Sequence, residues 1–509
     1  MEPGPRMREP TESAAAPQRS LYAVMRRLGR EPAPLAWITR QSWSPWLVVG
    51  LVCVGAFLGQ LDATIVQLAL PTLGKTFAAP LQQVSWVALA YLVAFASFLP
   101  IFGRLCEIVG RKSLYLTGYA LFVVASALCG LSTNLNELIV FRVLQGIGGS
   151  LLGANSISIL VAAIGPKQRG KALGIFAAAQ AVGMSAGPAV GGLILAALDW
   201  RWLFWLAAPF GTAAIVVGWL ALPQTETAER DKRFDWRGAV LIGPALIFLI
   251  VALNHLSAQT SPLTMAFLAG SSALGWLLIR HERASPRPLV DLLLFRSRAF
   301  CCGAIAVALA YALLYSMFFL MSFALEHGYG DSPAAAGLRL AIIPVALGAT
   351  APFSGALSDR FGAPLLSAAG MACCFGALLM LVLGGQESGG AHFVAAAAFA
   401  LFGAGLGAFI APNNHSTIEA APARLSGEAG SMLNLMRVLG ASLGVAAATA
   451  SLSWRLEVAG GGQNWLGVTG ASLLGAVASS LMIPAGLAAL AAAAALCATA
   501  PRAPKADLS

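Results

Sequence analysis

Fourteen apolar stretches, each of roughly 18 to 25 residues, follow one another from Trp46 to the C-terminal part of this chain of 509 residues. A helix of about 20 apolar residues crosses the hydrocarbon core of a bilayer. Inside that core every backbone polar group must be bonded within the protein, and a helix meets this requirement segment by segment. The pattern therefore predicts an all-α membrane protein with fourteen transmembrane helices.

Composition leads to the same class of protein. Hydrophobic residues make up 58% of the chain and charged residues only 11%, whereas soluble domains carry about 25% charged residues. This balance excludes a water-soluble fold. The formal net charge of +10 does not indicate a nucleic-acid partner, because the basic residues lie in one set of loops.

The distribution of lysine and arginine predicts the orientation. All but six of the 32 basic residues lie in alternate connecting segments, beginning with the N-terminal tail. Cytoplasmic loops of membrane proteins carry such an excess. We therefore expect an integral plasma membrane protein, in bacteria an inner-membrane protein, with both termini in the cytoplasm.

An internal repeat divides the chain. The sequence GRLCEIVGRKSLYLTG at 103–118 shares Gly, Leu, an acid, Gly, Leu and Gly at matching offsets with GALSDRFGAPLLSAAG at 355–370. Repeated halves are common in transporters, with the substrate held between them. The predicted domains are a disordered basic cytoplasmic tail, a six-helix half, an inserted helix pair, a second six-helix half and a cytoplasmic tail, at 1–45, 46–225, 236–280, 300–498 and 499–509.

Two charged residues lie at similar depth inside apolar stretches. Asp62 belongs to LDATIVQLALPTL at 61–73, and Arg142 begins RVLQGIGGS at 142–150. Counting along the helices at 1.5 Å per residue places both in the outer half of the bilayer, so the two side chains could pair. Charges inside the membrane are costly and mark functional sites. The alternatives are a structural acid paired to a neighbour and an arginine that only packs the first helix against the fourth.

The first copy of the repeat is a candidate conformational latch. Its glycines permit a tight turn, and its charged residues can pair with neighbouring helix ends. The second copy keeps only one acid and one base, which predicts a weaker latch, and an ordinary cluster of loop charges is the alternative. The predicted latch residues are Gly103, Glu107, Gly110, Arg111, Lys112, Asp359 and Arg360.

Small residues dominate GMSAGPAVGG at 183–192 in the fifth helix. Glycines spaced by four residues give a helix one smooth face for close packing, and a proline kinks it. Plain helix packing explains the glycines equally well. The residues concerned are Gly183, Gly187, Pro188, Gly191 and Gly192.

Polar and aromatic residues elsewhere predict a substrate cavity. GEAGSMLNLMRVLGASLG at 427–444 places an arginine near the middle of the thirteenth helix with no acid nearby. That arginine either binds a polar or anionic substrate group or pairs with an acid such as Asp62, and each other residue could instead form an ordinary interhelical hydrogen bond. The predicted lining is Gln60, Tyr91, Asn155, Asn413, Asn434 and Arg437.

Enzymatic and metal-binding patterns are absent from the sequence. The five histidines are scattered without HExxH spacing, no GxxxxGK loop is present, and the eight cysteines lie in or beside apolar stretches as small packing residues. We expect neither a catalytic centre, nor a metal site, nor a cofactor, and we expect transport that is not driven by ATP.

These motifs together resemble the fourteen-helix drug:proton antiporters of the major facilitator superfamily, the EmrB/QacA type, from residue 46 onward. The resemblance implies the major facilitator fold, with two six-helix halves and an inserted pair. It also implies a link between Arg142 and proton transfer, and it makes GMSAGPAVGG the mark of antiporters. Glu107 stands where the family more often has Asp. In some relatives a periplasmic adaptor protein is a partner.

The sequence therefore predicts a proton-coupled antiporter that works as a monomer and exports small amphiphilic compounds by alternating access. Asp62 is expected to exchange protons with the two sides, driven by the proton gradient. Because it is the only clear acid near mid-membrane, we expect monocations, neutral amphiphiles or weak acids rather than dications as substrates. The alternatives are a metabolite importer or facilitator on the same fold, and a membrane sensor or scaffold without transport.

Overall fold

A computed structural model gives the fold of the chain. It describes residues 31, 33–224, 235–255, 261–285, 289, 291–384, 391–422, 425–458 and 465–498. The predicted C-terminal tail and most of the predicted N-terminal tail lie outside these residues. The part of the N-terminal tail that is described contains the short helix α2 (Ala36–Thr39), which lies against the sixth membrane span.

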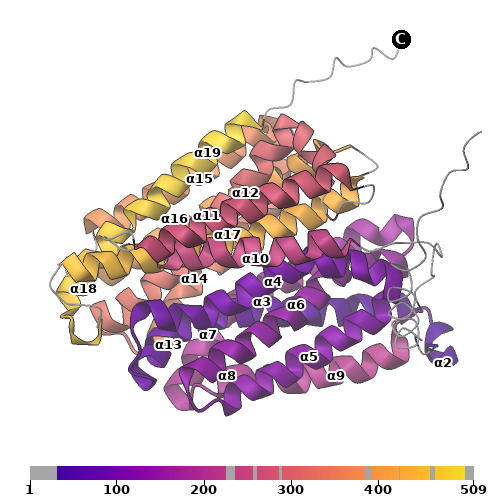
Figure 1. Ribbon diagram of the computed structural model, residues 1–509, viewed down its shortest axis with the longest axis horizontal. Helices are drawn as coiled ribbons and strands as arrows, with labels where there is room; N and C mark the ends of the chain where they lie inside the picture. The colour runs from indigo at the N-terminus through magenta and orange to yellow at the C-terminus, as the bar shows by residue number, and fades with distance from the viewer. Residues whose placement is uncertain are drawn as a thin grey trace, which may run out of the picture.

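The described residues form helices and connecting segments, without a strand among them (Figure 1). Fourteen helical spans are long and apolar enough to cross a membrane, so the predicted count is confirmed. The helices of these spans are α3 (Ser44–Thr76), α4 (Leu81–Val109), α5 (Arg111–Leu131), α6 (Leu135–Ala163), α7 (Arg169–Ala197), α8 (Trp202–Trp205) with α9 (Ala207–Ala221), α10 (Trp236–Asn254), α11 (Pro262–Ala284), α12 (Arg298–Phe323), α13 (Pro333–Leu340) with α14 (Ile342–Phe361), α15 (Ala363–Gly384), α16 (Ala391–Glu419), α17 (Ser426–Val458), and α18 (Gly470–Ser480) with α19 (Met482–Cys497).

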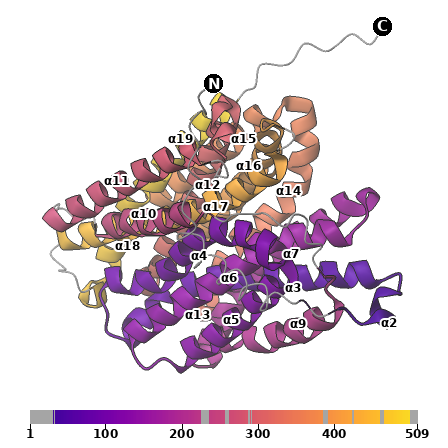
Figure 2. The same ribbon diagram turned by 45° about the vertical axis from the view of Figure 1, so that its right-hand side comes forward.

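The helices gather into two groups that lie side by side. In the first group α3 packs on α7, and α6 packs on both α4 and α5; in the second group α12 packs on α17, and α16 packs on both α14 and α15. Figures 1 and 2 show the first group in indigo to magenta and the second in red to yellow. This arrangement in two halves is the predicted fold, and the residue boundaries drawn for the domains stay predictions.

The repeat seen in the sequence is also present in the backbone. Gly110, between α4 and α5, has φ of +117°, and Gly362, between α14 and α15, has φ of +87°. The two glycines hold the same offset within 103–118 and 355–370. A positive φ of this size is strained for any residue with a Cβ, so each half requires glycine at the same tight turn.

The inserted pair, α10 and α11, is anchored on α4. At one end the amide of Asn254 donates to the hydroxyl of Ser85 over 3.0 Å. At the other end a small apolar cluster around Ala239 and Leu289 packs on α4 through side chains that include Ile101. α10 also packs on α17 of the second half.

A polar contact joins α10 to α11 at the end where α10 begins. Nε2 of His281 lies 2.8 Å from Oδ1 of Asp235, which also accepts the backbone N–H of Gly238. Burial disfavours the ionised carboxyl, but these hydrogen bonds outweigh it and hold the pKa of Asp235 below its ordinary value.

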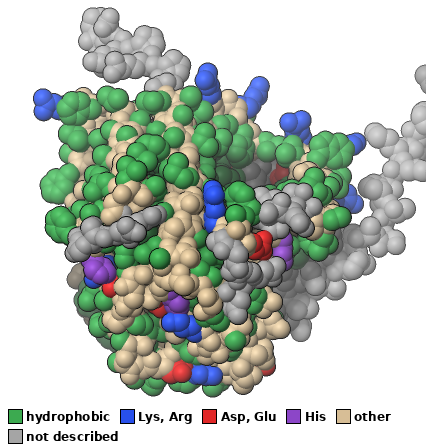
Figure 3. Space-filling model, turned by 90° about the vertical axis from the view of Figure 1, so that its left-hand side faces the viewer, with side chains coloured by type: hydrophobic (Ala, Val, Ile, Leu, Met, Phe, Trp, Pro, Cys, Tyr) green, Lys and Arg blue, Asp and Glu red, His purple; other side chains and the backbone are tan. Residues whose placement is uncertain are grey.

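The two ends of the bundle differ. We call the end at which α3 begins and α19 ends the termini side, and the end that carries the α3–α4 connection the far side. In Figure 1 the far side, with α13 and α18, lies at the left. Figure 3 looks at this far side, where a few charged side chains are scattered among hydrophobic ones.

Candidate functional site

A buried ion pair joins the first and fourth membrane spans. Nη1 of Arg142, on α6, lies 2.7 Å from Oδ2 and 2.9 Å from Oδ1 of Asp62, on α3. The side chain of Arg142 is 1% exposed and that of Asp62 is 6% exposed. The structure thus brings together the two residues that the sequence placed at similar depth, and removal of either one would leave an uncompensated buried charge.

Further hydrogen bonds complete this cluster. Nε of Arg142 donates to the backbone oxygen of Val87 on α4, over 2.9 Å. The side chain of Gln145 accepts from Arg142, over 2.6 Å, and donates both to Asp62, over 2.9 Å, and to Ser126, over 2.7 Å. Gln145 lies one turn after Arg142 in RVLQGIGGS, so its position three residues beyond an intramembrane arginine was the available signal. Gln145 was not among the predicted site residues.

A cavity of about 290 Å³ lies next to this cluster, between the two halves. Its lining comes from the middle of α3, α4 and α12 and from the termini-side portions of α6, α7, α16 and α17. Asp62 and Arg142 are not part of that lining. The ring of Tyr91 faces the cavity and also covers Arg142, whose Cζ lies 4.5 Å from the ring centroid.

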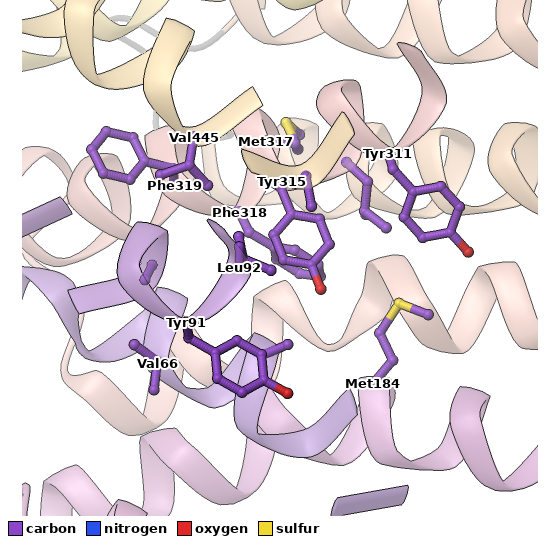
Figure 4. Close-up of a cluster of buried hydrophobic side chains, with 14 of the residues drawn as sticks. Val66, Tyr91, Leu92, Met184, Tyr311, Tyr315, Met317, Phe318, Phe319 and Val445 are labelled. Atoms are coloured by element: carbon purple, nitrogen blue, oxygen red, sulfur yellow. The ribbon is translucent and has the colours of Figure 1, made fainter. Parts of the chain in front are cut away.

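Four of the six residues predicted for the cavity line it, namely Gln60, Tyr91, Asn434 and Arg437. Figure 4 shows how aromatic side chains from both halves surround this space, with Tyr91 from α4 and Tyr311 and Tyr315 from α12. These two tyrosines of α12 and the polar residues Gln180 and Asn414 were missed. Their side chains do not differ in type from many others in the apolar stretches, so only the packing of the helices identifies them.

The other two predicted residues, Asn155 and Asn413, do not reach the cavity. The amide of Asn155 donates to the backbone oxygen of Leu151, one turn earlier in α6. The amide of Asn413 donates to the backbone oxygen of Gly303 on α12, over 3.1 Å. Asn155 is thus bonded within its own helix, and Asn413 links α16 to α12. One step along α16 turns the side chain by about 100°, which places Asn414 in the lining instead of Asn413.

The glycines of the fifth-helix motif form the contact between α7 and α3. A Cβ built on Gly183 would lie 2.5 Å from the backbone oxygen of Phe57, and one built on Gly191 would lie 2.6 Å from Cγ1 of Ile65. At Gly187 the Cβ would overlap Oγ1 of Thr64. The predicted smooth face is therefore in use, and α7 continues through Pro188 without ending.

Gly192, at the end of the same motif, contacts the second half. Its added Cβ would overlap the backbone oxygen of Pro333 and lie 3.1 Å from Cα of Gly337, both on α13.

Trp465 lies at a second contact between the halves on the far side. It is buried among groups from both halves, with Nε1 donating to the backbone oxygen of Ala79 over 3.2 Å and its ring against Phe323. The halves are thus in tight contact on the far side, while the cavity lies toward the termini side.

The predicted latch residues meet different surroundings. Nζ of Lys112 is buried and donates to two carbonyl oxygens at the end of α9, those of Trp219 and Leu222, over 3.0 and 2.8 Å. Arg111 beside it is half-buried. Gly103 has open space where a Cβ would be, so no contact there requires glycine.

An ion pair between the halves at the termini side includes Arg104, which was not among the predicted latch residues. Arg104 of α4 lies 3.1 Å from Oε1 of Glu428 on α17. The side chain of Glu107 is outside the described part of the structure. Asp359 and Arg360 of the second copy are exposed. The expectation of a weaker second latch stays a prediction.

Comparison with known proteins decides the family. The model of the Major Facilitator Superfamily matches residues 52–445. The chain belongs to the Major Facilitator Superfamily. The match covers the first half from residue 52, the inserted pair and the second half as far as α17, and it includes the buried ion pair and every residue that lines the cavity.

Similar members of the superfamily cover most of the chain. The riboflavin transporter RibZ of Clostridioides difficile is 31% identical over 402 residues, which are 79% of this chain and 87% of that protein. The tetracenomycin C resistance and export protein of Streptomyces glaucescens is 31% identical over 405 residues, 79% of this chain and 75% of that protein. The multidrug resistance protein Stp of Mycobacterium tuberculosis is 29% identical, with 77% and 73% covered.

Solved structures of transporters share the fold. A bacterial homologue of the human lysosomal transporter Spinster superposes with a TM-score of 0.66 at 14% identity, covering 90% of this chain and 97% of that one. A D-xylose-proton symporter superposes with a TM-score of 0.61 at 15% identity, covering 88% and 96%. At this identity the likeness concerns the major facilitator fold alone.

Proposed function

We propose that this transporter exports small amphiphilic compounds in exchange for protons, by alternating access between its two halves. The observation that carries the proposal is the buried pair of Asp62 and Arg142 beside, but not inside, a cavity that lies between the halves. A carboxylate buried in the membrane and paired with a cation can change its charge when it takes up a proton. The pair is therefore suited to carry the coupling ion, and the cavity to carry the substrate.

Protonation of Asp62 would neutralise the negative charge of the buried ion pair. Arg142 would then be held by the backbone oxygen of Val87 and by Gln145, neither of which carries a compensating charge. Tyr91 touches Arg142 and faces the cavity, so a change in the pair reaches the substrate site through one side chain. These five residues belong to the first half, and the second half contributes Arg437 and the tyrosines of α12 to the cavity.

Four further expectations belong to this proposal. The exporter lies in the plasma membrane with both termini in the cytoplasm, so the cavity faces the compartment from which substrate is taken. The proton gradient drives the cycle without a cofactor. One chain is the transporting unit, and a periplasmic adaptor is a partner in organisms that have an outer membrane.

The relatives support export and also favour a second candidate. Two of them are named for resistance or export, and one is named for riboflavin transport. Uptake of a metabolite on the same fold is therefore the second candidate function, because a fold does not fix the direction of transport.

Export and its coupling can be tested in cells that lack their own efflux pumps. The transporter is expressed and challenged with a panel of toxic cationic, neutral and anionic amphiphiles, with and without an uncoupler. Export raises the tolerated concentration, and the uncoupler restores intracellular accumulation. Replacement of Asp62 by Asn abolishes the protection, whereas Asp199→Asn, an exposed acid between α7 and α8, does not. Protection that survives Asp62→Asn would disprove the coupling scheme, and accumulation above the external level would favour uptake.

A further inference from the structure

The described lining of the cavity carries charge of one sign only, which is positive. Among the described residues that line it, Arg437 is the only charged side chain, and the lining contains no carboxylate. The lining otherwise consists of aromatic and aliphatic side chains with a few amides and hydroxyls. An apolar cavity with one fixed positive charge favours a ligand of the opposite charge.

Arg437 is placed to bind such a ligand. It lies on α17 and is half-buried, with Cζ 4.9 Å from the ring centroid of Tyr311. This contact uses the charge and the face of the guanidinium but none of its five N–H donors. Among the described residues no acid lies within ion-pair distance of Arg437, so its charge is available to a ligand in the cavity.

The nearby acid cannot serve a cationic ligand in the same way. Both oxygens of Asp62 accept hydrogen bonds from Arg142, and Gln145 donates to one of them. The ring of Tyr91 lies between this cluster and the cavity, which Asp62 does not line. A cation in the cavity would therefore meet Arg437 with no carboxylate to offset the repulsion.

Aromatic rings and an unpaired amide oxygen add to the selectivity. Tyr311 and Tyr315 from one half and Tyr91 from the other line the cavity (Figure 4). Oδ1 of Asn414 is buried without a hydrogen-bond partner among the described residues, and the amide belongs to the lining. A planar ring would stack among the tyrosines, and a donor on it would satisfy this oxygen.

We propose that the cavity selects organic anions that carry an aromatic ring, such as aryl carboxylates, and that Arg437 is the residue that recognises the acidic group. This inference names the substrate class of the exporter proposed above, and it rests on this cavity being the transport cavity. Charge-assisted hydrogen bonds to a carboxylate are roughly twice as strong as neutral ones, so loss of Arg437 should weaken anion binding by at least about tenfold.

The test uses three ligands with the same ring and the same attachment point, namely naphthoate, naphthamide and naphthamidine. They carry a negative charge, no charge and a positive charge at neutral pH. Binding to the purified full chain in nanodiscs is measured by titration calorimetry without a proton gradient. We expect naphthoate to bind at least about tenfold more tightly than naphthamidine, with naphthamide between them.

Variants assign the preference to one residue. Arg437→Gln should weaken naphthoate binding at least about tenfold and affect naphthamide binding much less, while Arg437→Lys should retain part of the preference. Naphthamide binding that the variant retains also shows that it is folded. Tighter binding of naphthamidine by the unaltered protein would overturn the proposal even if no variant folds, and so would naphthoate binding that is insensitive to Arg437→Gln.

Failure of this inference can be separated from failure of the exporter proposal. Proteoliposomes with an imposed proton gradient are tested for naphthoate movement in parallel with the binding experiment. A preference for naphthoate without gradient-driven movement keeps the selectivity and removes proton coupling. Gradient-driven movement of naphthamidine alone keeps the coupling and removes the proposed substrate class.

Discussion

The ring of Tyr91 covers the guanidinium of Arg142, with 4.5 Å between Cζ and the ring centroid, and thereby separates the ion pair from the cavity. Replacement of Tyr91 by Ala should expose Asp62 and Arg142 to cavity water, whereas Tyr91→Phe keeps the ring. We expect Tyr91→Ala to leak protons without substrate, which a pH-sensitive dye inside proteoliposomes would report. Equal leak rates in the Ala and Phe variants would show that the ring is not the barrier.

Gln145 links Asp62, Arg142 and Ser126, so it should matter for transport although it does not line the cavity. Gln145→Met keeps a similar volume and removes every hydrogen bond of the amide. A hydrogen bond to a charged group contributes about 1.5 to 3 kcal/mol, which corresponds to a loss of transport rate of roughly tenfold or more. The exposed Gln83, at the far-side end of α4, gives a matched control in Gln83→Met. A transport rate in Gln145→Met equal to that of the control would contradict the role of the amide.

Two glycines on α7 predict opposite results for the same substitution. A Cβ on Gly187 would overlap Oγ1 of Thr64 on α3, whereas Gly174 has open space around it. Gly187→Ala should therefore cost about 1 to 3 kcal/mol of stability through overpacking, and Gly174→Ala should be neutral or slightly stabilising. Thermal unfolding of the two purified variants in detergent measures the difference. Equal melting temperatures would refute the close contact of α3 and α7.

Trp465 seals the far side, because its ring and its Nε1 contact both halves. Trp465→Ala leaves a void at that contact, and truncation of a buried tryptophan costs about 3 to 5 kcal/mol in protein cores. We expect the variant to populate a conformation in which the far side is open. Spin labels on the exposed positions Gln83 and Ser332, in a cysteine-free background, should then show a longer distance by double electron-electron resonance.

The control for this experiment is Trp454→Ala, since Trp454 lies on α17 with 38% of its surface exposed. Its distance distribution should match that of the unaltered protein. If Trp465→Ala gives the same distribution as the control, the seal does not depend on this side chain.

If the substrate is an anion, the transport rate should depend strongly on the membrane voltage. With one proton entering for each anion that leaves, two positive charges move inward per cycle, against one for a neutral substrate. Each charge contributes about 2.3 kcal/mol per 100 mV. In proteoliposomes with a valinomycin-set potential, naphthoate movement should therefore respond about twice as steeply as naphthamide movement. Equal slopes would mean that the anion is carried with its proton.

The sequence predicts the fold well because its strongest signals act within single segments. The length of each apolar stretch and the side on which basic residues fall need no knowledge of neighbouring helices. The repeat is equally local, and Gly110 and Gly362 adopt the positive φ that the shared turn requires. The count of fourteen spans follows from such signals.

The candidate site was less predictable, because it depends on which face of each helix meets which neighbour. Asp62 and Arg142 stand out, since a charge inside an apolar stretch is conspicuous wherever it points. An asparagine is not conspicuous in this way: Asn413 and Asn414 are adjacent in the sequence, yet one bonds to α12 and the other lines the cavity. Tyr311 and Tyr315 were missed for the same reason.

The anchoring of α10 has a consequence for motion. When the two halves rock against each other, a helix that contacts both of them must lose or slide along one of its contacts. α10 is such a helix, because it packs on α4 of the first half and on α17 of the second. Its polar tie, from Asn254 to Ser85, and its apolar cluster at Ala239 both hold it to α4, one at each end. The inserted pair should therefore move as a rigid body with the first half, and its contact with α17 should slide when the halves rock.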